Sequence, residues 1–246
     1  ELSEENILVL DMAEFKVEGE KEFSPKEEVL RLDNICRERL GLRERGEAIV
    51  QPWVYGEAPD VSKVTLRYTF NSEIDYEGAF LGLEDADKAE IIFNGEKVSN
   101  EIVDNYVDFS IYKVKLGKIQ KGENELIIIY PFGPSANLET VFVLGYFGVK
   151  VMGTESTVIA LPEKIGFGEI LSQGFPFYSG AITYKIPVNV ENGSVEVEAT
   201  DYRGGLITVE VDGEVLVEEC RIEVQCHCST VHMVSLEDSV LSKETT

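Results

Sequence analysis

The chain has 246 residues, of which 43% are hydrophobic and 28% charged, enough for one large β domain or two ordinary β-sandwiches. It carries 46 acidic and 22 basic residues, for a formal net charge of −24. An acidic surface repels phosphate backbones, so we expect no nucleic-acid partner. No apolar run approaches the ~20 residues that a membrane helix needs, so we expect no membrane partner.

The first 41 residues predict a strand followed by a short surface helix. Residues 7–17 alternate loosely between apolar and polar, as in a strand. Apolar residues then recur at close to helical spacing at Val29, Leu32, Cys36 and Leu40. We therefore expect a helix within residues 25–40 that ends at Gly41, with Cys36 packed on its apolar face.

From residue 64 onward, the pattern is one of short strands separated by turns. The Asn94-Gly95 pair predicts a two-residue hairpin, because a type I′ turn needs positive φ at both central residues. No long helical period follows, so the sequence predicts an all-β fold.

Two strand segments recur at one fixed offset, which indicates a duplicated β-module. Residues 64–70 resemble residues 182–188, and residues 89–98 resemble residues 207–216, each 118 residues further along. We expect two tandem jelly-roll β-sandwiches, the first over residues 1–152 and the second over 158–225.

The predicted second sandwich is unequal to the first and is expected to be truncated or divergent. Residues 153–157 are small and polar and predict the linker between the two. After its own Asp-Gly turn, the second copy runs into a Cys- and His-containing segment. We expect residues 226–246 to be a disordered or non-native tail.

An ordered series of short motifs resembles a known group of proteins. The motifs are Asn6-Ile-Leu-Val-Leu-Asp11, Leu32-Asp-Asn-Ile-Cys-Arg37, Gln51-Pro-Trp53, Val107-Asp-Phe109, Leu116, Gly122-Glu-Asn124, Leu126-Ile127, Leu138-Glu139, Leu144-Gly-Tyr-Phe-Gly-Val149, Gln173-Gly-Phe-Pro-Phe-Tyr-Ser-Gly180 and Thr183-Tyr184. Their order is similar to that in the C-terminal β-sandwich region of bacterial glycoside hydrolases. The groups in question are the family 106 α-L-rhamnosidase-like proteins and the family 2 sugar-binding domains.

The resemblance implies a galactose-binding-like jelly-roll fold and a non-catalytic accessory role. In such enzymes the catalytic carboxylates lie in a separate barrel domain, typically upstream, and this chain has no βα alternation of its own. The partners implied are carbohydrate and that barrel. The chain begins without Met or a signal-peptide pattern, so we expect a segment of a longer bacterial polypeptide, either cytoplasmic or secreted.

Aromatic residues are the candidate carbohydrate-binding side chains. Trp53 and Tyr55 share a strand face at i and i+2, and Phe177 and Tyr178 form a second group near several glycines and a proline. Exposed aromatic rings stack on the apolar faces of sugars. Packing in a core or between modules is the alternative explanation for both groups.

Two acidic residues are the candidates for an alternative, catalytic interpretation. Glu84 and Glu139 each lie among apolar residues, where burial can raise a carboxyl pKa for acid catalysis. The alternative is that each is a structural carboxylate paired with an arginine such as Arg37 or Arg67.

Metal chemistry has weak support in the sequence. The cluster of Cys220, Cys226, His227, Cys228 and His232 has a spacing that matches no common zinc site. We expect no cofactor, while the resemblance leaves room for a structural calcium ion at the rim of the jelly roll.

Three functions therefore follow from the sequence. The preferred one is a carbohydrate-binding or structural accessory region of a larger glycoside hydrolase. The alternatives are a glycoside hydrolase acting through a carboxylate pair in a cleft, and a structural or assembly module without a ligand.

Overall fold

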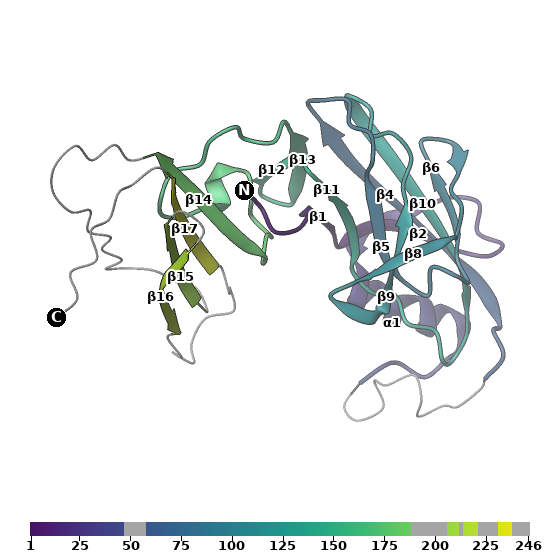
Figure 1. The fold of residues 1–246 in the computed structure, drawn as a ribbon. Coiled ribbons are helices and arrows are strands. Elements are labelled where there is room, and N and C mark those ends of the chain that lie inside the picture. Colours follow the sequence, from purple (N-terminus) through teal and green to yellow (C-terminus); the bar gives the residue numbers. More distant parts are fainter. Residues whose placement is uncertain (47–57, 188–205, 212–213, 221–230, 238–246) are drawn as a thin grey trace, which may run out of the picture. The chain divides into compact units, whose positions relative to one another are not determined.

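The computed structural model describes residues 1–46, 58–187, 206–211, 214–220 and 231–237. The chain divides into two compact units (Figure 1). The larger unit comprises Asn6–Ile165 and Ile170–Pro176, and the smaller unit comprises Glu1–Glu5, Gly166–Glu169 and Phe177–Thr246. The predicted division at residues 1–152, 158–225 and 226–246 stays a prediction.

The larger unit is a sandwich of two β-sheets. The five-stranded sheet has the order β1 (Asn6–Leu10), β11 (Val141–Gly145), β5 (Phe80–Glu84), β9 (Asp108–Lys115) and β8 (Ile102–Tyr106), all antiparallel. The eight-stranded sheet has the order β12 (Gly148–Met152), β13 (Glu155–Ile159), β4 (Ser62–Ser72), β10 (Gly122–Phe132), β6 (Glu90–Phe93) and β7 (Glu96–Lys97). Beside β4 lie β2 (Met12–Val17) and β3 (Ser24–Glu28).

The core lies between these two sheets. Burial alternates with a period of two along the long antiparallel pair β4 and β10, so one face of each strand is buried. Inner residues of β10 (Leu126 and Ile128) join residues of the opposite sheet (Leu81 and Val143) in one hydrophobic cluster. The prediction of an all-β, sandwich-like fold with one short helix is confirmed.

The segment predicted as one strand over residues 7–17 is two strands in different sheets. β1 pairs with β11 in the five-stranded sheet, and β2 pairs with β4 in the other. The chain crosses the sandwich at Asp11, whose carbonyl accepts a 2.8 Å hydrogen bond from the Val29 amide. The prediction of a single strand was therefore wrong, because period-two alternation does not show which sheet a strand joins.

The helix α1 (Val29–Leu40) lies within the predicted range. The Glu28 carboxylate caps its start by accepting hydrogen bonds from the amides of Leu30 and Arg31, both 3.0 Å long. Gly41 ends the helix with a φ of 67°. The first residues of the predicted range, 25–28, instead belong to β3. Cys36 is fully buried, as predicted, and burial raises the pKa of its thiol to about 12.

The predicted Asn94-Gly95 turn and the predicted linker at residues 153–157 both lie in β-hairpins. Asn94 and Gly95 have φ values of 49° and 81° between β6 and β7, which confirms the predicted hairpin. Residues 153–157, predicted to be a linker, instead form the turn and first residues of the β12–β13 hairpin, in which Met152 pairs with Glu155. A short 3-10 helix covers Leu171–Gln173.

The described part of the smaller unit is one sheet whose strand order repeats part of the larger unit. Its order is β14 (Ala181–Pro187), β17 (Val231–Glu237), β15 (Leu206–Val211) and β16 (Glu214–Cys220). The duplicated segments make the series β14, β15 and β16 correspond to β4, β6 and β7. In both units one strand lies between the first two of these, but β10 is antiparallel to both neighbours whereas β17 is parallel to both.

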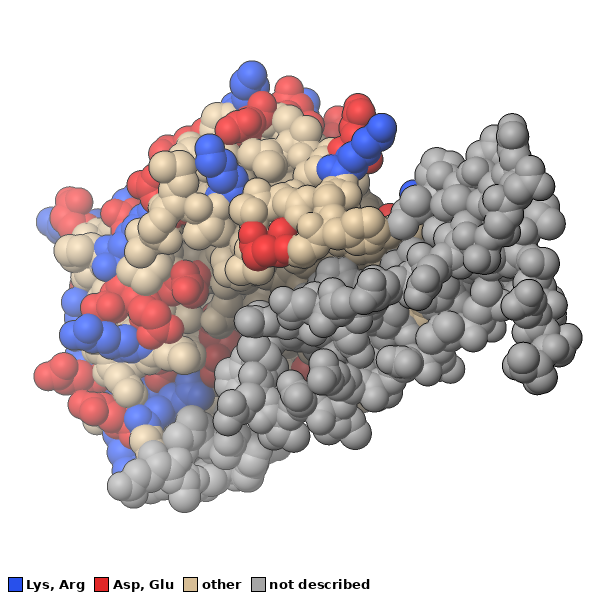
Figure 2. All heavy atoms as spheres, turned by 90° about the vertical axis from the view of Figure 1, so that its left-hand side faces the viewer, with Lys and Arg blue, Asp and Glu red and all other residues tan. Residues whose placement is uncertain are grey.

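The described surface carries both signs of charge. On the face shown in Figure 2, acidic and basic side chains are interspersed over the coloured part of the molecule. None of the helices in the described ranges is long and apolar enough to cross a membrane.

Candidate functional site

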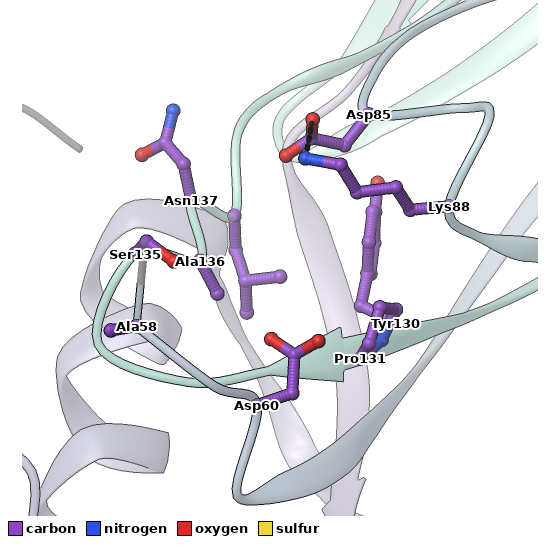
Figure 3. Close-up of a pocket in the computed structure, with 10 residues that line it drawn as sticks. Ala58, Asp60, Asp85, Lys88, Tyr130, Pro131, Ser135, Ala136 and Asn137 are labelled. Carbon is purple, nitrogen blue, oxygen red and sulfur yellow. Dashed lines mark hydrogen bonds and ion pairs between the residues drawn. The ribbon is translucent and has the colours of Figure 1, made fainter. Parts of the chain in front are cut away.

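A pocket of about 300 Å³ opens at one end of the sandwich in the larger unit (Figure 3). Its walls come from the segment before β4, the β5–β6 turn, the end of β10 and the loop between β10 and β11. The lining residues are Ala58, Asp60, Asp85, Lys88, Tyr130, Pro131, Ser135, Ala136, Asn137 and Leu138. The pocket therefore combines carboxylate, ammonium, hydroxyl and amide groups with several apolar side chains.

The β5–β6 turn supplies an ion pair to the pocket. Asp85 adopts a φ of 52°, and its carbonyl accepts hydrogen bonds from the amides of Lys88 and Ala89 at 2.9 and 3.2 Å. The turn brings the Lys88 Nζ to 2.8 Å from the Asp85 Oδ1. This hydrogen bond raises the pKa of Lys88, so the ammonium stays charged beside its partner. The Asp60 carboxylate lies on the opposite side of the pocket (Figure 3).

Tyr130 brings a buried phenol to the pocket. Tyr130 is only 5% exposed and lines the pocket. Burial raises its pKa, so the phenol is a neutral group that can both donate and accept a hydrogen bond. Tyr68, on the neighbouring strand, has a fully buried hydroxyl without a partner among the described residues, but Tyr68 does not line the pocket.

Asn137 connects the pocket wall to Glu84. Its Nδ2 donates a 2.9 Å hydrogen bond to the Glu84 Oε2, while its buried Oδ1 has no partner among the described residues. Burial raises the pKa of Glu84, and the nearby negative charge of Glu139 adds to that effect, although the Asn137 hydrogen bond opposes it. A buried acceptor without a donor costs free energy unless a ligand or water supplies one.

The loop that carries Asn137 is held by a buried ion pair on α1. Asp33 and Arg37 lie one helical turn apart, their side chains are each 1% exposed, and the Arg37 Nε lies 2.5 Å from the Asp33 Oδ1. The remaining Arg37 nitrogens donate to the carbonyls of Pro134 (3.2 Å) and Ala136 (2.5 Å). The Asp33 Oδ2 accepts a 3.1 Å hydrogen bond from the Leu138 amide. Helix α1 therefore fixes the pocket wall through both charges.

A second arginine extends this network to the surface. The Arg45 Nη2 lies 3.3 Å from the Glu139 Oε1, and its Nη1 lies 3.7 Å from the Asp33 Oδ2. Glu139 is therefore a carboxylate paired with an arginine, as the alternative interpretation of the sequence predicted, but that arginine is Arg45. The partners named from the sequence were wrong, since Arg37 pairs with Asp33 and Arg67 pairs with Glu14 at 2.6 Å.

A glycine lets the loop pack closely against the other wall. A Cβ at Gly133 would lie 2.8 Å from the Pro59 carbonyl oxygen and 2.9 Å from the Asp60 Cα. Such distances require the backbone to shift, so only glycine fits between β10 and this segment. Gly133 therefore sets the separation of the Asp60 and Asn137 sides of the pocket.

The predicted aromatic residues lie elsewhere or outside the described residues. Trp53 and Tyr55 fall outside the described residues. Phe177, in the smaller unit, is 37% exposed. Tyr178 is 5% exposed, and its hydroxyl accepts a 3.0 Å hydrogen bond from the Ser3 amide and donates a 2.9 Å bond to the Ala181 carbonyl. Carbohydrate binding by these four residues stays a prediction.

Candidate metal ligands do not gather in the described part of the chain. There, no group of three or more His, Cys, Asp or Glu side chains is placed to hold a metal ion. Residues 226–228 of the predicted Cys/His cluster lie outside the described ranges.

The pocket residues Asp60, Lys88, Tyr130 and Asn137 were not singled out in the sequence. Tyr130 lies near the end of the hydrophobic strand β10, and its place in the alternating pattern is that of a core residue. Residues 133–137, a run of Gly, Pro, Ser, Ala and Asn, are the one signal of a loop between two strands that could have pointed to this wall.

Comparison with known proteins adds little to this description. No protein-family model matches the chain, and no curated protein matches it. A solved structure of a GH2 beta-galacturonidase from Eisenbergiella tayi bound to glycerol has 13% sequence identity and a TM-score of 0.32. The match covers 63% of this chain and 28% of that enzyme, and a likeness of this size does not define a family. Fold and site define an all-β protein with a small polar pocket.

The buried ion pair on α1 leads to a test of stability. Replacing Arg37 with Met should lower the free energy of unfolding by ~3–5 kcal/mol, because the buried Asp33 then loses its closest counter-charge and keeps only Arg45 at 3.7 Å. The control is Arg67→Met, whose pair with Glu14 is about 30% exposed and should cost ~1 kcal/mol or less. Urea denaturation followed by tryptophan fluorescence measures both, and equal losses would contradict the assigned role of Arg37.

The raised pKa of Glu84 leads to a test of pH dependence. The folded state binds the Glu84 carboxyl proton more tightly than the unfolded state does. The protonated Glu84 therefore adds to the free energy of unfolding below about pH 4.5, and this contribution is lost as the pH rises through the folded-state pKa. Glu84→Gln removes this dependence. The free energy of unfolding of the variant, relative to the parent, should therefore rise between pH 4 and pH 7 in urea titrations. A relative fall over that interval would show that the native site favours the carboxylate.

Proposed function

We propose that this chain is a non-catalytic accessory region of a larger glycoside hydrolase and that it binds carbohydrate in the pocket of the larger unit. The observation that supports this most is a buried polar atom without a partner on a residue that lines this pocket, together with a nearby tyrosine. The Asn137 Oδ1 is buried and has no partner among the described residues, and the largely buried Tyr130 lines the same pocket. A ligand rich in hydroxyl groups would donate a hydrogen bond to the Asn137 Oδ1, and it would donate to or accept from the Tyr130 hydroxyl.

The composition of the pocket suits a single sugar ring. Its volume of about 300 Å³ lies at the lower end for small-molecule sites. Pro131, Ala136 and Leu138 provide apolar contact for ring carbons, and Asp60 and Asp85 can accept hydrogen bonds from sugar hydroxyls.

The charges of the pocket favour a neutral sugar over a uronic acid. Asp60 and Asp85 place two carboxylates at the pocket, and the single ammonium, on Lys88, is already paired with Asp85. A ligand carboxylate would face this negative charge with no free cation among the lining residues.

The motif order supports the wider assignment. The segments that resemble accessory regions of bacterial glycoside hydrolases include β1, the loop before β11 and the 173–180 segment. On this proposal, the larger unit has a galactose-binding-like jelly-roll fold, and the parent polypeptide carries a catalytic barrel. We also propose, from the same resemblance, that a structural calcium ion can bind at the rim of the sandwich.

A pair of tyrosine variants tests the pocket. Titrating the ¹⁵N-labelled chain with neutral methyl glycosides, including those of galactose and rhamnose, should shift the amide signals of residues 85–88 and 135–138. Tyr130→Phe should weaken that binding about fivefold, the equivalent of one lost hydrogen bond at ~1 kcal/mol. Tyr68→Phe removes a buried hydroxyl outside the pocket, so it should leave the affinity unchanged.

Three results would contradict the proposal. They are sugar binding that both tyrosine variants leave intact, galacturonate binding as strongly as the neutral glycosides, and the absence of any signal shift at saturating sugar.

The alternative, a glycoside hydrolase acting through Glu84 and Glu139, has one observation in its favour. Burial raises the pKa of Glu84, as a general acid requires. The Glu139 carboxylate is occupied by Arg45, and neither acid lines the pocket. Hydrolysis of aryl glycosides by this chain alone, lost in Glu84→Gln and Glu139→Gln without unfolding, would establish this alternative and overturn the accessory role.

A further inference from the structure

The β8–β9 hairpin of the larger unit exposes an unusual amount of apolar surface. Val107 at its tip is 85% exposed, and Phe109 beside it is 87% exposed. On β8, Ile102 and Val103 are each 42% exposed. None of these residues lines the pocket. Exposed apolar residues gathered on one hairpin in this way mark interaction surfaces more often than isolated ones do.

The backbone at the tip is held in a conformation that valine disfavours. Val107 has a φ of 60°, in the left-handed region that β-branched residues rarely adopt. Asparagine or glycine would occupy this position with less strain. Strain of this kind persists where it serves a function rather than stability, and here it keeps an apolar side chain at an exposed turn.

The edge of the sheet is a poor template for another strand. β8 lies last in the strand order, but its pairing with β9 shifts register between Ile102 and Asp104 and again between Asn105 and Tyr106. Irregularities and charged side chains on an edge strand discourage strand addition. A second copy of this chain is also disfavoured, since each copy carries a net charge of −24.

The charges around the tip identify the chemistry of the partner. Glu101, Asp104 and Asp108 are all exposed, and within the described ranges none of them forms an ion pair. The side chain and backbone of Ser110 donate hydrogen bonds to Asp108 and hold the pKa of its carboxyl below the ordinary value. An apolar tip with an acidic surround complements an apolar socket with a basic rim.

We propose that the β8–β9 hairpin docks through Phe109 and Val107 onto a protein surface that carries an apolar socket rimmed by Lys and Arg. Phe109 is the anchor, because a large exposed aromatic ring gains most from burial in a socket. The acidic side chains around it orient the encounter and exclude partners of the same charge. This site is independent of the sugar pocket.

The probe is a synthetic amphipathic helical peptide of leucine and lysine, whose apolar stripe runs between rows of lysines. Titrated into the ¹⁵N-labelled full chain, it should shift the amide signals of residues 101–110 first. Phe109→Ser should weaken binding about tenfold. Val107→Asn should weaken binding severalfold and leave stability unchanged or higher, because asparagine accepts the left-handed conformation. Met152→Ser is the control, since Met152 is 68% exposed but lies outside the hairpin.

Several outcomes would overturn the proposal. One is binding spread over the whole acidic surface and insensitive to Phe109→Ser, which would indicate attraction by net charge alone. Another is equal binding of a leucine and glutamate peptide, which would remove the role of the acidic surround. A third is hairpin binding to neutral phosphatidylcholine vesicles but not to the lysine peptide, which would identify a membrane rather than a protein as the partner.

Discussion

The buried pair of Asp33 and Arg37 is the interaction on which the site depends most. A pair removed from water in this way is stable only when its remaining hydrogen-bonding groups are also satisfied. Here the loop between β10 and β11 provides that satisfaction, because Arg37 donates to two of its carbonyls and Asp33 accepts from one of its amides. The Arg37 guanidinium also lies 5.4 Å from the centre of the Phe132 ring. The helix, the end of β10 and the pocket wall are therefore one unit.

The strands of the sandwich position the other pocket residues. β10 alternates strictly, so Leu126, Ile128, Tyr130 and Phe132 all point into the core. Tyr130 is the member of this series that lines the pocket. Gly133 then lets the chain turn against the segment before β4. The pocket thus arises where a core strand ends, and its polar groups have rigid support.

Much of the fold could be predicted from local patterns. The long alternating strands, the Asn94-Gly95 turn and the helix ending at Gly41 each depend on residues close together in the sequence. The splitting of residues 7–17 between two sheets could not be predicted, because a strand's pattern gives its faces but not its partners. The duplicated segments indicated a repeated β-module, but not that β17 would run parallel where β10 runs antiparallel.

The pocket was harder to predict than the fold for a physical reason. Asp33 and Arg37 have the i, i+4 spacing of an ordinary surface ion pair, and nothing local shows that both contact a loop about 100 residues away. Tyr130 reads as a core residue, which it also is. The sequence offers Glu84 and Glu139 as candidate catalytic carboxylates because they lie among apolar residues. Their actual neighbours, Asn137 and Arg45, are brought to them only by the tertiary structure.

A crystal structure of the chain grown with a neutral methyl glycoside tests most directly whether the pocket of the larger unit binds sugar. The account predicts a sugar ring between Asp60, Lys88 and Asn137, with one hydroxyl hydrogen-bonded to the Tyr130 hydroxyl. An empty pocket at saturating sugar, or a sugar bound only at another surface such as that of Phe177, would contradict it.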